Sequence, residues 1–163
     1  MTGSVTGILL AAGQSTRFGS NKLLHPLENG APMAVVAARH LKSVLAHGIA
    51  VVADIESELA GLLAAEGLRI IPNPRTGEGM GTSIACGVTA SQDAGGWVVA
   101  LADMPRIPGT MIQAVVAGLE RGADIIAPVY RGRRGHPVGF SARHAPALMQ
   151  LQADTGARGI IAA

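Results

Sequence analysis

The stretch Val5-Thr-Gly-Ile-Leu-Leu-Ala-Ala-Gly-Gln-Ser-Thr-Arg-Phe-Gly-Ser-Asn-Lys22 joins the first apolar run of the chain to a glycine-rich, basic segment. The run Val5–Ala11 is too short for a helix and is soon followed by glycine, which predicts a strand buried on both faces. The glycines let the backbone turn tightly and approach a ligand closely. Because Arg17 and Lys22 add two positive charges, the stretch predicts a strand followed by a loop that binds a nucleoside triphosphate.

This loop differs from two common phosphate-binding motifs. Lys22 is not preceded by glycine and followed by Ser or Thr, as in a P-loop, and the three glycines of the dinucleotide fingerprint are absent. Glycine-rich turns also occur for purely structural reasons. The charges of Arg17 and Lys22 favour the ligand-binding interpretation over the structural one.

The rest of the chain alternates between strand-like and helix-like apolar runs. Strands separated by helices are typical of right-handed crossovers and a largely parallel sheet. We therefore expect a single three-layer α/β/α domain over residues 1–163. The expected strands are 49–53, 68–71, 97–101 and 125–129, the expected helices are 32–45, 56–66, 81–90 and 108–121, and 137–140 is expected to return as a hairpin strand.

Composition excludes several classes of function. Aromatic residues make up 2% of the chain, so stacking platforms for single-stranded nucleic acid are nearly absent. The net charge is only +2, which fits a small anionic substrate better than nucleic acid. No apolar run is long enough to cross a bilayer, and no basic region precedes the first one. The single cysteine, Cys86, cannot form an internal disulfide, so we expect a cytoplasmic protein. From the composition and the apolar runs we expect no nucleic-acid or membrane partners.

Ligands of open parallel sheets bind at the carboxyl ends of the strands, where the loops converge. The loops after Leu10, Ile71 and Leu101 all emerge at that edge and can share one pocket. Asp103 follows the third of these strands and precedes Met104-Pro105. Asp103 is either a Mg²⁺ ligand or a cap for the following turn. The loop that carries Lys22 favours the metal ligand, because Mg²⁺ needs few protein carboxylates when phosphates are present.

Two other segments carry polar candidates. The glycine-rich segment 73–83 runs into a predicted helix, so it either contacts a nucleotide or an acceptor or is an ordinary loop with a capped helix. Asn73 is either a base or ribose contact or a turn former. His136 is either a substrate contact or base, or only solvated, and the arginines of 131–134 either bind an acceptor phosphate or keep a hairpin tip soluble.

Together these segments resemble a known family. Leu10–Lys22 resembles the signature loop of nucleotidyltransferases with a Rossmann-like fold of the nucleotide-diphospho-sugar transferase type. The stretches Leu101-Ala-Asp-Met-Pro105, Gly79-Met-Gly-Thr-Ser83 and Arg134-Gly-His-Pro-Val138 make the chain similar to the molybdenum cofactor cytidylyltransferase branch. The resemblance covers nearly the whole chain.

The resemblance implies a Mg²⁺-dependent transfer of CMP from CTP to the phosphate of molybdopterin, with release of pyrophosphate. Catalysis would consist mainly of positioning and charge neutralisation. Arg17 and Lys22 would hold the phosphates and Asp103 the Mg²⁺. Molybdoenzyme chaperones are implied as partners. The implied nucleotide-binding residues are Leu10, Ala11, Ala12, Gly13, Arg17, Lys22, Asn73 and Ser83, and the implied acceptor-binding residues are Arg134 and His136.

Base specificity is expected to depend on Ala12. The Ala11-Ala12 pair resembles the cytidylyltransferase version, whereas guanylyltransferase relatives usually have glycine at the position of Ala12. A methyl group there would crowd a purine. The alternatives are a GTP-using guanylyltransferase and a nucleotidyltransferase that acts on a sugar phosphate.

The C-terminal end of the chain adds a further alternative. Family members normally continue past Asp154-Thr-Gly-Ala-Arg158 to an acidic motif, which is not found before Ala163. We therefore expect the domain to lack the family's C-terminal segment. This leaves open a non-catalytic protein that binds a nucleotide or a cofactor.

Overall fold

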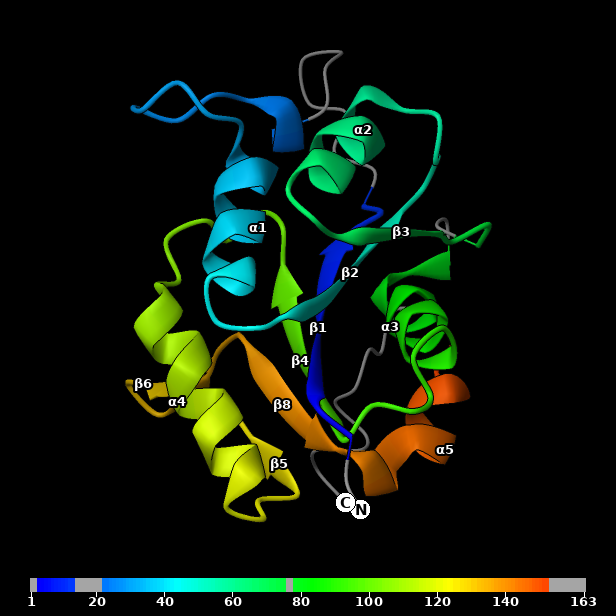
Figure 1. Ribbon diagram of the computed structural model, residues 1–163, viewed down its shortest axis with the longest axis vertical. Helices are drawn as coiled ribbons and strands as arrows, with labels where there is room; N and C mark the ends of the chain where they lie inside the picture. The colour runs from blue at the N-terminus through cyan, green and yellow to red at the C-terminus, as the bar shows by residue number, and fades with distance from the viewer. Residues whose placement is uncertain (1–2, 14–21, 76–77, 153–163) are drawn as a thin grey trace.

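The computed structural model describes residues 3–13, 22–75 and 78–152 (Figure 1). Its main feature is a six-stranded sheet in the order β3-β2-β1-β4-β8-β5. The strands of this sheet are β1 (Val5–Ala11), β2 (His47–Val52), β3 (Arg69–Pro72), β4 (Gly96–Leu101), β5 (Ile125–Ile126) and β8 (Val138–Ser141). The helices are α1 (Met33–Lys42), α2 (Glu58–Ala65), α3 (Met80–Thr89), α4 (Gly109–Glu120) and α5 (Ala145–Met149), with short 3-10 helices η2 (Lys22–Leu24) and η4 (Ala142–His144).

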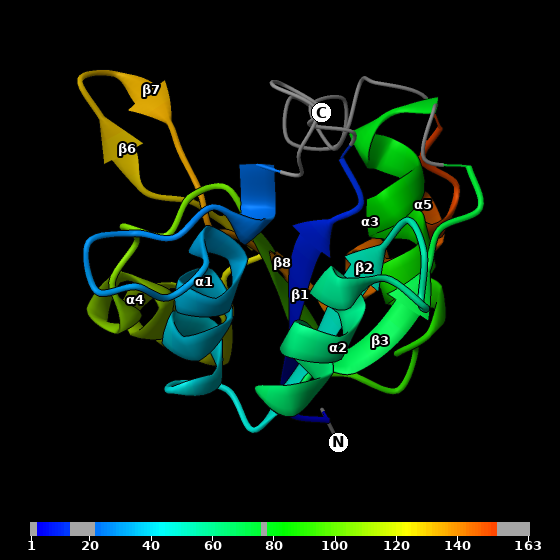
Figure 2. The same cartoon turned by 90° about the horizontal axis from the view of Figure 1, so that it is seen from above.

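Helices cover both faces of the sheet, which confirms the predicted three-layer α/β/α architecture. Helices α1, α2 and α4 pack on one face, and α3 and α5 pack on the other (Figure 2). Side chains of β1 alternate between the two layers, because Leu9 joins the first core and Ile8 the second. Both side chains are fully buried. The apolar run that predicted a strand buried on both faces therefore lies at the centre of the molecule.

Local sequence signals set the ends of the helices. Ser57 begins α2, because its Oγ accepts a hydrogen bond from the Ala60 N–H at 3.1 Å. Gly67 and Gly122 follow α2 and α4 with φ values of 91° and 99°, a conformation that glycine adopts without strain. None of the helices in the described residues combines the length and apolar character of a membrane-spanning segment.

The region 125–140 differs from the prediction in one respect. A single strand was expected over 125–129, but the structure divides it into β5 and β6 (Val129–Tyr130), which pairs with β7 (Arg133–Arg134) in a separate hairpin. Pro128 lies at the break and has no N–H to donate to a strand ladder. The predicted return at 137–140 is confirmed as β8, which pairs antiparallel with β5 and also with β4. The returning strand therefore lies inside the sheet.

Candidate functional site

The carboxyl ends of the strands form a common edge, as the sequence predicted. The Ala102 N–H donates to the Leu10 carbonyl at 3.1 Å, which joins the residues after β4 to the end of β1. The Asn73 N–H donates to the Val52 carbonyl at 2.8 Å, which joins the residue after β3 to the end of β2. Figure 2 shows η2, the start of α3 and the β6–β7 hairpin on this side of the sheet.

The end of β1 presents backbone rather than side chains at this edge. Leu10, Ala11 and Ala12 are buried, and the methyl group of Ala12 packs in the core beneath α3 and α5. Gly13 is exposed, and a Cβ added there would meet no atom of the described residues within 4 Å. The described chain resumes at Lys22, which is exposed at the start of η2, whereas Arg17 lies outside the described residues. The part of the edge formed by described residues therefore leaves space beside Gly13.

Asp103 and His136 come from different segments and interact at this edge. Asp103 is exposed in a turn held by the Met104 N–H, which donates to the Leu101 carbonyl at 3.1 Å. Burial lowers the pKa of His136, and the negative charge of Asp103 opposes this by favouring the protonated imidazole. His136 is therefore mainly neutral at pH 7, and the carboxylate of Asp103 contributes the local negative charge.

The donor set around Asp103 fits a divalent cation that is shared with a bound phosphate. Within residues 3–13, 22–75 and 78–152, no group of three or more His, Cys, Asp or Glu side chains could hold a metal ion. The Asp103 carboxylate interacts electrostatically with His136 but takes part in no ion pair among the described residues, so it can bind a cation. One such carboxylate suits Mg²⁺, which takes its remaining oxygens from phosphates and water.

Asn73 is a buried structural junction in the described structure. Its Nδ2 group donates to Thr82 Oγ1 and to Ser83 Oγ, both at 2.9 Å, and its Oδ1 accepts from the Arg75 N–H at 2.8 Å. Asn73, Thr82 and Ser83 are all at most 5% exposed. These bonds fix the first turn of α3 to the end of β3, and the role of Asn73 in nucleotide binding stays a prediction.

The start of α3 completes one wall of the edge. Gly79 precedes the helix with φ 102° and provides no side-chain cap, so the first N–H groups of α3 receive no bond from a capping side chain. Thr82 Oγ1 donates to the Gly79 carbonyl at 2.8 Å. In the segment before the helix, the Arg75 guanidinium donates two hydrogen bonds, of 2.7 and 2.9 Å, to the Glu78 carboxylate. The sequence gave no indication of Thr82, because its role depends on Asn73, nine residues earlier.

Arg134 lies in the exposed strand β7, two residues before His136. The β6–β7 hairpin to which it belongs stands clear of the sheet (Figure 2). The Gly135 N–H donates to the Pro128 carbonyl at 2.8 Å and closes the base of the hairpin. Arg134 thus lies at the base of the hairpin, on the side of the chain that leads to His136.

Cys86 lies on α3. It is half-buried and, together with Arg75, lines a cavity of about 370 Å³ between α3 and the residues after α5. Burial raises the pKa of its thiol, although the charge of Arg75 opposes the effect. The side chain is therefore mainly a neutral thiol at pH 7, which agrees with a structural role.

Comparison with known proteins identifies the family. Residues 7–163 match the MobA-like NTP transferase domain. The chain belongs to this family. It is 30% identical to nicotine blue oxidoreductase of Paenarthrobacter nicotinovorans, over 94% of this chain and 79% of that protein. It is 29% identical to purine catabolism protein PucB of Bacillus subtilis (strain 168), over 95% of this chain and 79% of that protein.

A solved structure has a similar fold. A nucleotidyl transferase from Methanothermobacter superposes with a TM-score of 0.80 at 19% identity, covering 97% of this chain and 80% of that one. The fold is therefore the nucleotidyltransferase fold of the nucleotide-diphospho-sugar transferase type, as the sequence indicated. Membership of the MobA-like family makes the domain a nucleotidyltransferase.

Proposed function

We propose that the chain transfers CMP from CTP to a molybdopterin-type cofactor. An oxygen of the acceptor phosphate attacks the α-phosphorus of CTP, and the bond from that phosphorus to the β-phosphate oxygen breaks, which releases pyrophosphate. The observation that supports this best is the common sheet edge, at which Gly13 follows β1, Asp103 follows β4, and His136 interacts with Asp103.

On the nucleotide side, the reaction requires neutralisation of a triphosphate. Lys22 is exposed and can reach phosphate oxygens, and Arg17 is proposed to do the same. Asp103 would hold Mg²⁺, which when bound supplies positive charge to the phosphate oxygens. The backbone of Ala11, Ala12 and Gly13 would lie against the base and ribose. The start of α3, which includes Ser83 and has no side-chain cap, would offer backbone N–H groups to the nucleotide.

On the acceptor side, we propose that Arg134 and His136 bind the phosphorylated cofactor. The Arg134 guanidinium is exposed and suits a phosphate, because it can make two parallel hydrogen bonds. His136 is mainly neutral at pH 7, so it can exchange a hydrogen bond with the acceptor without adding a charge. Molybdoenzyme chaperones are proposed to receive the product.

GTP is a second candidate nucleotide, because the methyl group of Ala12 is directed into the core. Its side chain is 4% exposed and packs among the core residues beneath α3. A methyl group that points into the core narrows a base pocket less than one that points outward. If Ala12 nevertheless limits base size, Ala12→Gly should raise the use of GTP relative to CTP. An unchanged ratio would remove Ala12 from the specificity argument.

The experiment that tests the proposed function is pyrophosphate release with Mg²⁺ and a molybdopterin acceptor, with CTP, GTP, ATP and UTP compared side by side. Sugar phosphates serve as alternative acceptors. Release with CTP alone supports the proposal. Release with GTP, or only with a sugar phosphate, replaces it with the corresponding alternative. Nucleotide binding without release under any condition indicates a non-catalytic binding protein.

A further inference from the structure

The β6–β7 hairpin carries an exposed basic surface with an apolar centre. Its basic residues Arg131, Arg133 and Arg134 are all exposed, and Val129 and Tyr130 are 66% and 73% exposed. The Arg131 guanidinium lies 5.3 Å from the centre of the Tyr130 ring, which holds charge and ring together. None of the three arginines forms an ion pair with another described residue. We refer to residues 129–134 as the basic hairpin.

A second exposed segment has the opposite charge and the same layout. Asp54, Glu56 and Glu58 are exposed and surround Ile55, which is 51% exposed. Within the described ranges, these carboxylates also make no ion pair. Two local bonds hold the segment in shape, from the Glu56 N–H to Asp54 Oδ1 at 2.9 Å and from Ser57 Oγ to the Asp54 carbonyl at 2.7 Å. We refer to residues 54–58 as the acidic segment.

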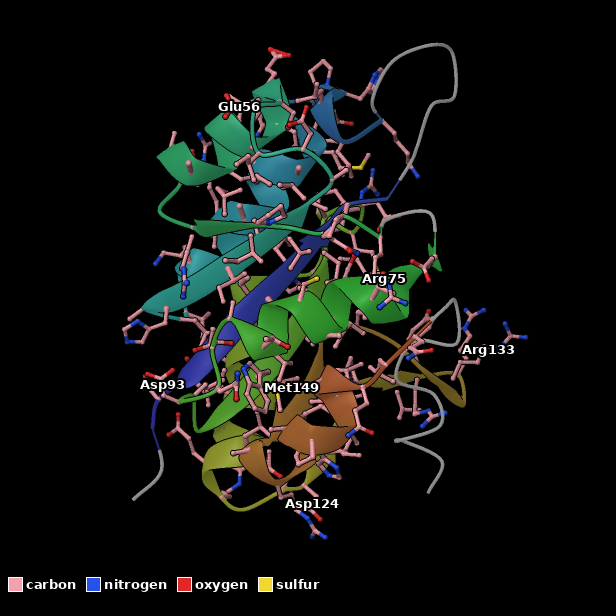
Figure 3. The ribbon with its side chains drawn as sticks, turned by 90° about the vertical axis from the view of Figure 1, so that its right-hand side faces the viewer. Glu56, Arg75, Asp93, Asp124, Arg133 and Met149 are labelled. Carbon is pink, nitrogen blue, oxygen red and sulfur yellow. The ribbon has the colours of Figure 1, made fainter. Side chains whose placement is uncertain are left out.

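The two surfaces cannot neutralise each other within one chain. Figure 3 labels Glu56 and Arg133 and shows their side chains at separate corners of the molecule, each directed away from the body. By contrast, Arg39 and Glu66, which belong to different elements of the chain, form an ion pair with a distance of 2.9 Å. Among the residues that the structure describes, the hairpin and the acidic segment therefore have no ion-pair partners, although each carries three charges of one sign.

We propose that the basic hairpin of one copy of this chain docks on the acidic segment of a second copy. Ile55 would pack against Val129 and Tyr130, and the carboxylates of Glu56 and Glu58 would face the hairpin arginines. Charge complementarity of this kind sets the orientation of a contact and makes it sensitive to salt. Because two different surfaces meet, the contact either closes reciprocally into a dimer or extends into a longer assembly. The contact is proposed to rest on Arg131 and Arg133, to which the proposed function gives no role.

The test is sedimentation velocity of the full chain over a concentration series at low and high salt. The wild type should associate reversibly, and high salt should weaken the association. Arg131→Glu with Arg133→Glu, and separately Glu56→Lys with Glu58→Lys, should each weaken self-association at least about tenfold. Arg134 is left unchanged because it is proposed to bind the acceptor.

A mixing experiment separates specific docking from a general charge effect. The two double variants should associate with each other when mixed, because each then meets an opposite charge in both contacts. Arg106→Glu with Arg121→Glu makes the same change in net charge as the hairpin variant, but outside both surfaces, and should leave association unchanged. Thermal melting checks that every variant is folded. A wild type that is monomeric throughout, a control that weakens association equally, or folded variants that fail to associate on mixing would each overturn the proposal.

Discussion

The side chains of Asn73 and Ser83 are joined by a hydrogen bond of 2.9 Å that links the end of β3 to the first turn of α3. A second bond of the same length joins Asn73 to Thr82. Because all three residues are buried, this junction holds α3 in a fixed position relative to the edge that carries Asp103. The geometry of the candidate site therefore depends on a side chain that the sequence indicated only as a ligand contact or a turn former.

Removing this junction should destabilise the fold. Asn73→Ala leaves the Arg75 N–H without its acceptor and two hydroxyl groups without their donor, so we expect a loss of about 1–3 kcal/mol in the free energy of unfolding. Urea unfolding can be followed by the fluorescence of Trp97, the single tryptophan, which is fully buried. Asn29→Ala is the control, because Asn29 accepts one bond in an exposed turn. Equal losses in both variants would contradict the role of Asn73.

Loss of the Asp103 charge should reduce catalysis without unfolding the protein. Asp103→Asn keeps the shape of the side chain but removes the charge that would hold Mg²⁺, so pyrophosphate release should fall by at least about a hundredfold. Asp93→Asn is the matched control, because Asp93 is exposed before the start of β4, whereas Asp103 follows the end of that strand. If the two variants keep the same activity, Asp103 has no role in metal binding.

Lys22 should contribute mainly to binding of the triphosphate. It is exposed, so Lys22→Ala should leave the melting temperature unchanged. Removal of one charged contact to phosphate should reduce kcat/KM by roughly tenfold to a hundredfold. Arg121→Ala removes a positive charge from the residue that follows α4 and serves as the control. A rate equal to that of the wild type would exclude the phosphate role of Lys22.

His136 should make the stability of the metal-free protein depend on pH. Its pKa in the folded state is lowered by burial, below the ordinary value of about 6.5 expected for the unfolded chain. Between these two values the unfolded chain binds more protons, so stability should fall as the pH falls through this range. His136→Gln should remove this part of the acid destabilisation. A pH profile of urea unfolding checks it, and an unchanged slope would contradict the burial effect.

Asp103 should partly offset this shift in the pKa of His136. Its carboxylate favours the protonated imidazole, so Asp103→Asn should lower the pKa of His136 further. An NMR titration of the histidine ring protons measures this directly, and His47, exposed at the start of β2, provides an internal reference. A pKa that rises or stays constant in the variant would show that the two residues do not interact.

The elements near the centre of the sheet could be predicted from the sequence. The apolar run before Gly13 gave β1 with its exact bounds, and the runs before Asn73 and Asp103 placed those residues at the same edge of the sheet. These signals are strong because a strand buried on both faces needs a continuous apolar run.

The remaining features depend on contacts between distant residues. The pairing of β8 with β4 follows no local pattern, since a strand of four residues fits several places in a sheet. The bonds of Asn73 to Thr82 and Ser83 depend on the path of the loop between them, which residue types do not specify. The effect of Asp103 on His136 likewise arises only once the chain has folded.

The position of β8 has a consequence for how the protein is made. In the finished sheet, the edge of β4 that faces away from β1 is paired with β8, whose first residue, Val138, is synthesised well after Leu101. A growing chain that already contains β1 and β4 therefore carries an apolar strand edge with open backbone hydrogen-bonding groups. Until Ser141 has emerged from the ribosome, this edge is open to pairing with other nascent chains, so the need for chaperones should be greatest during this interval.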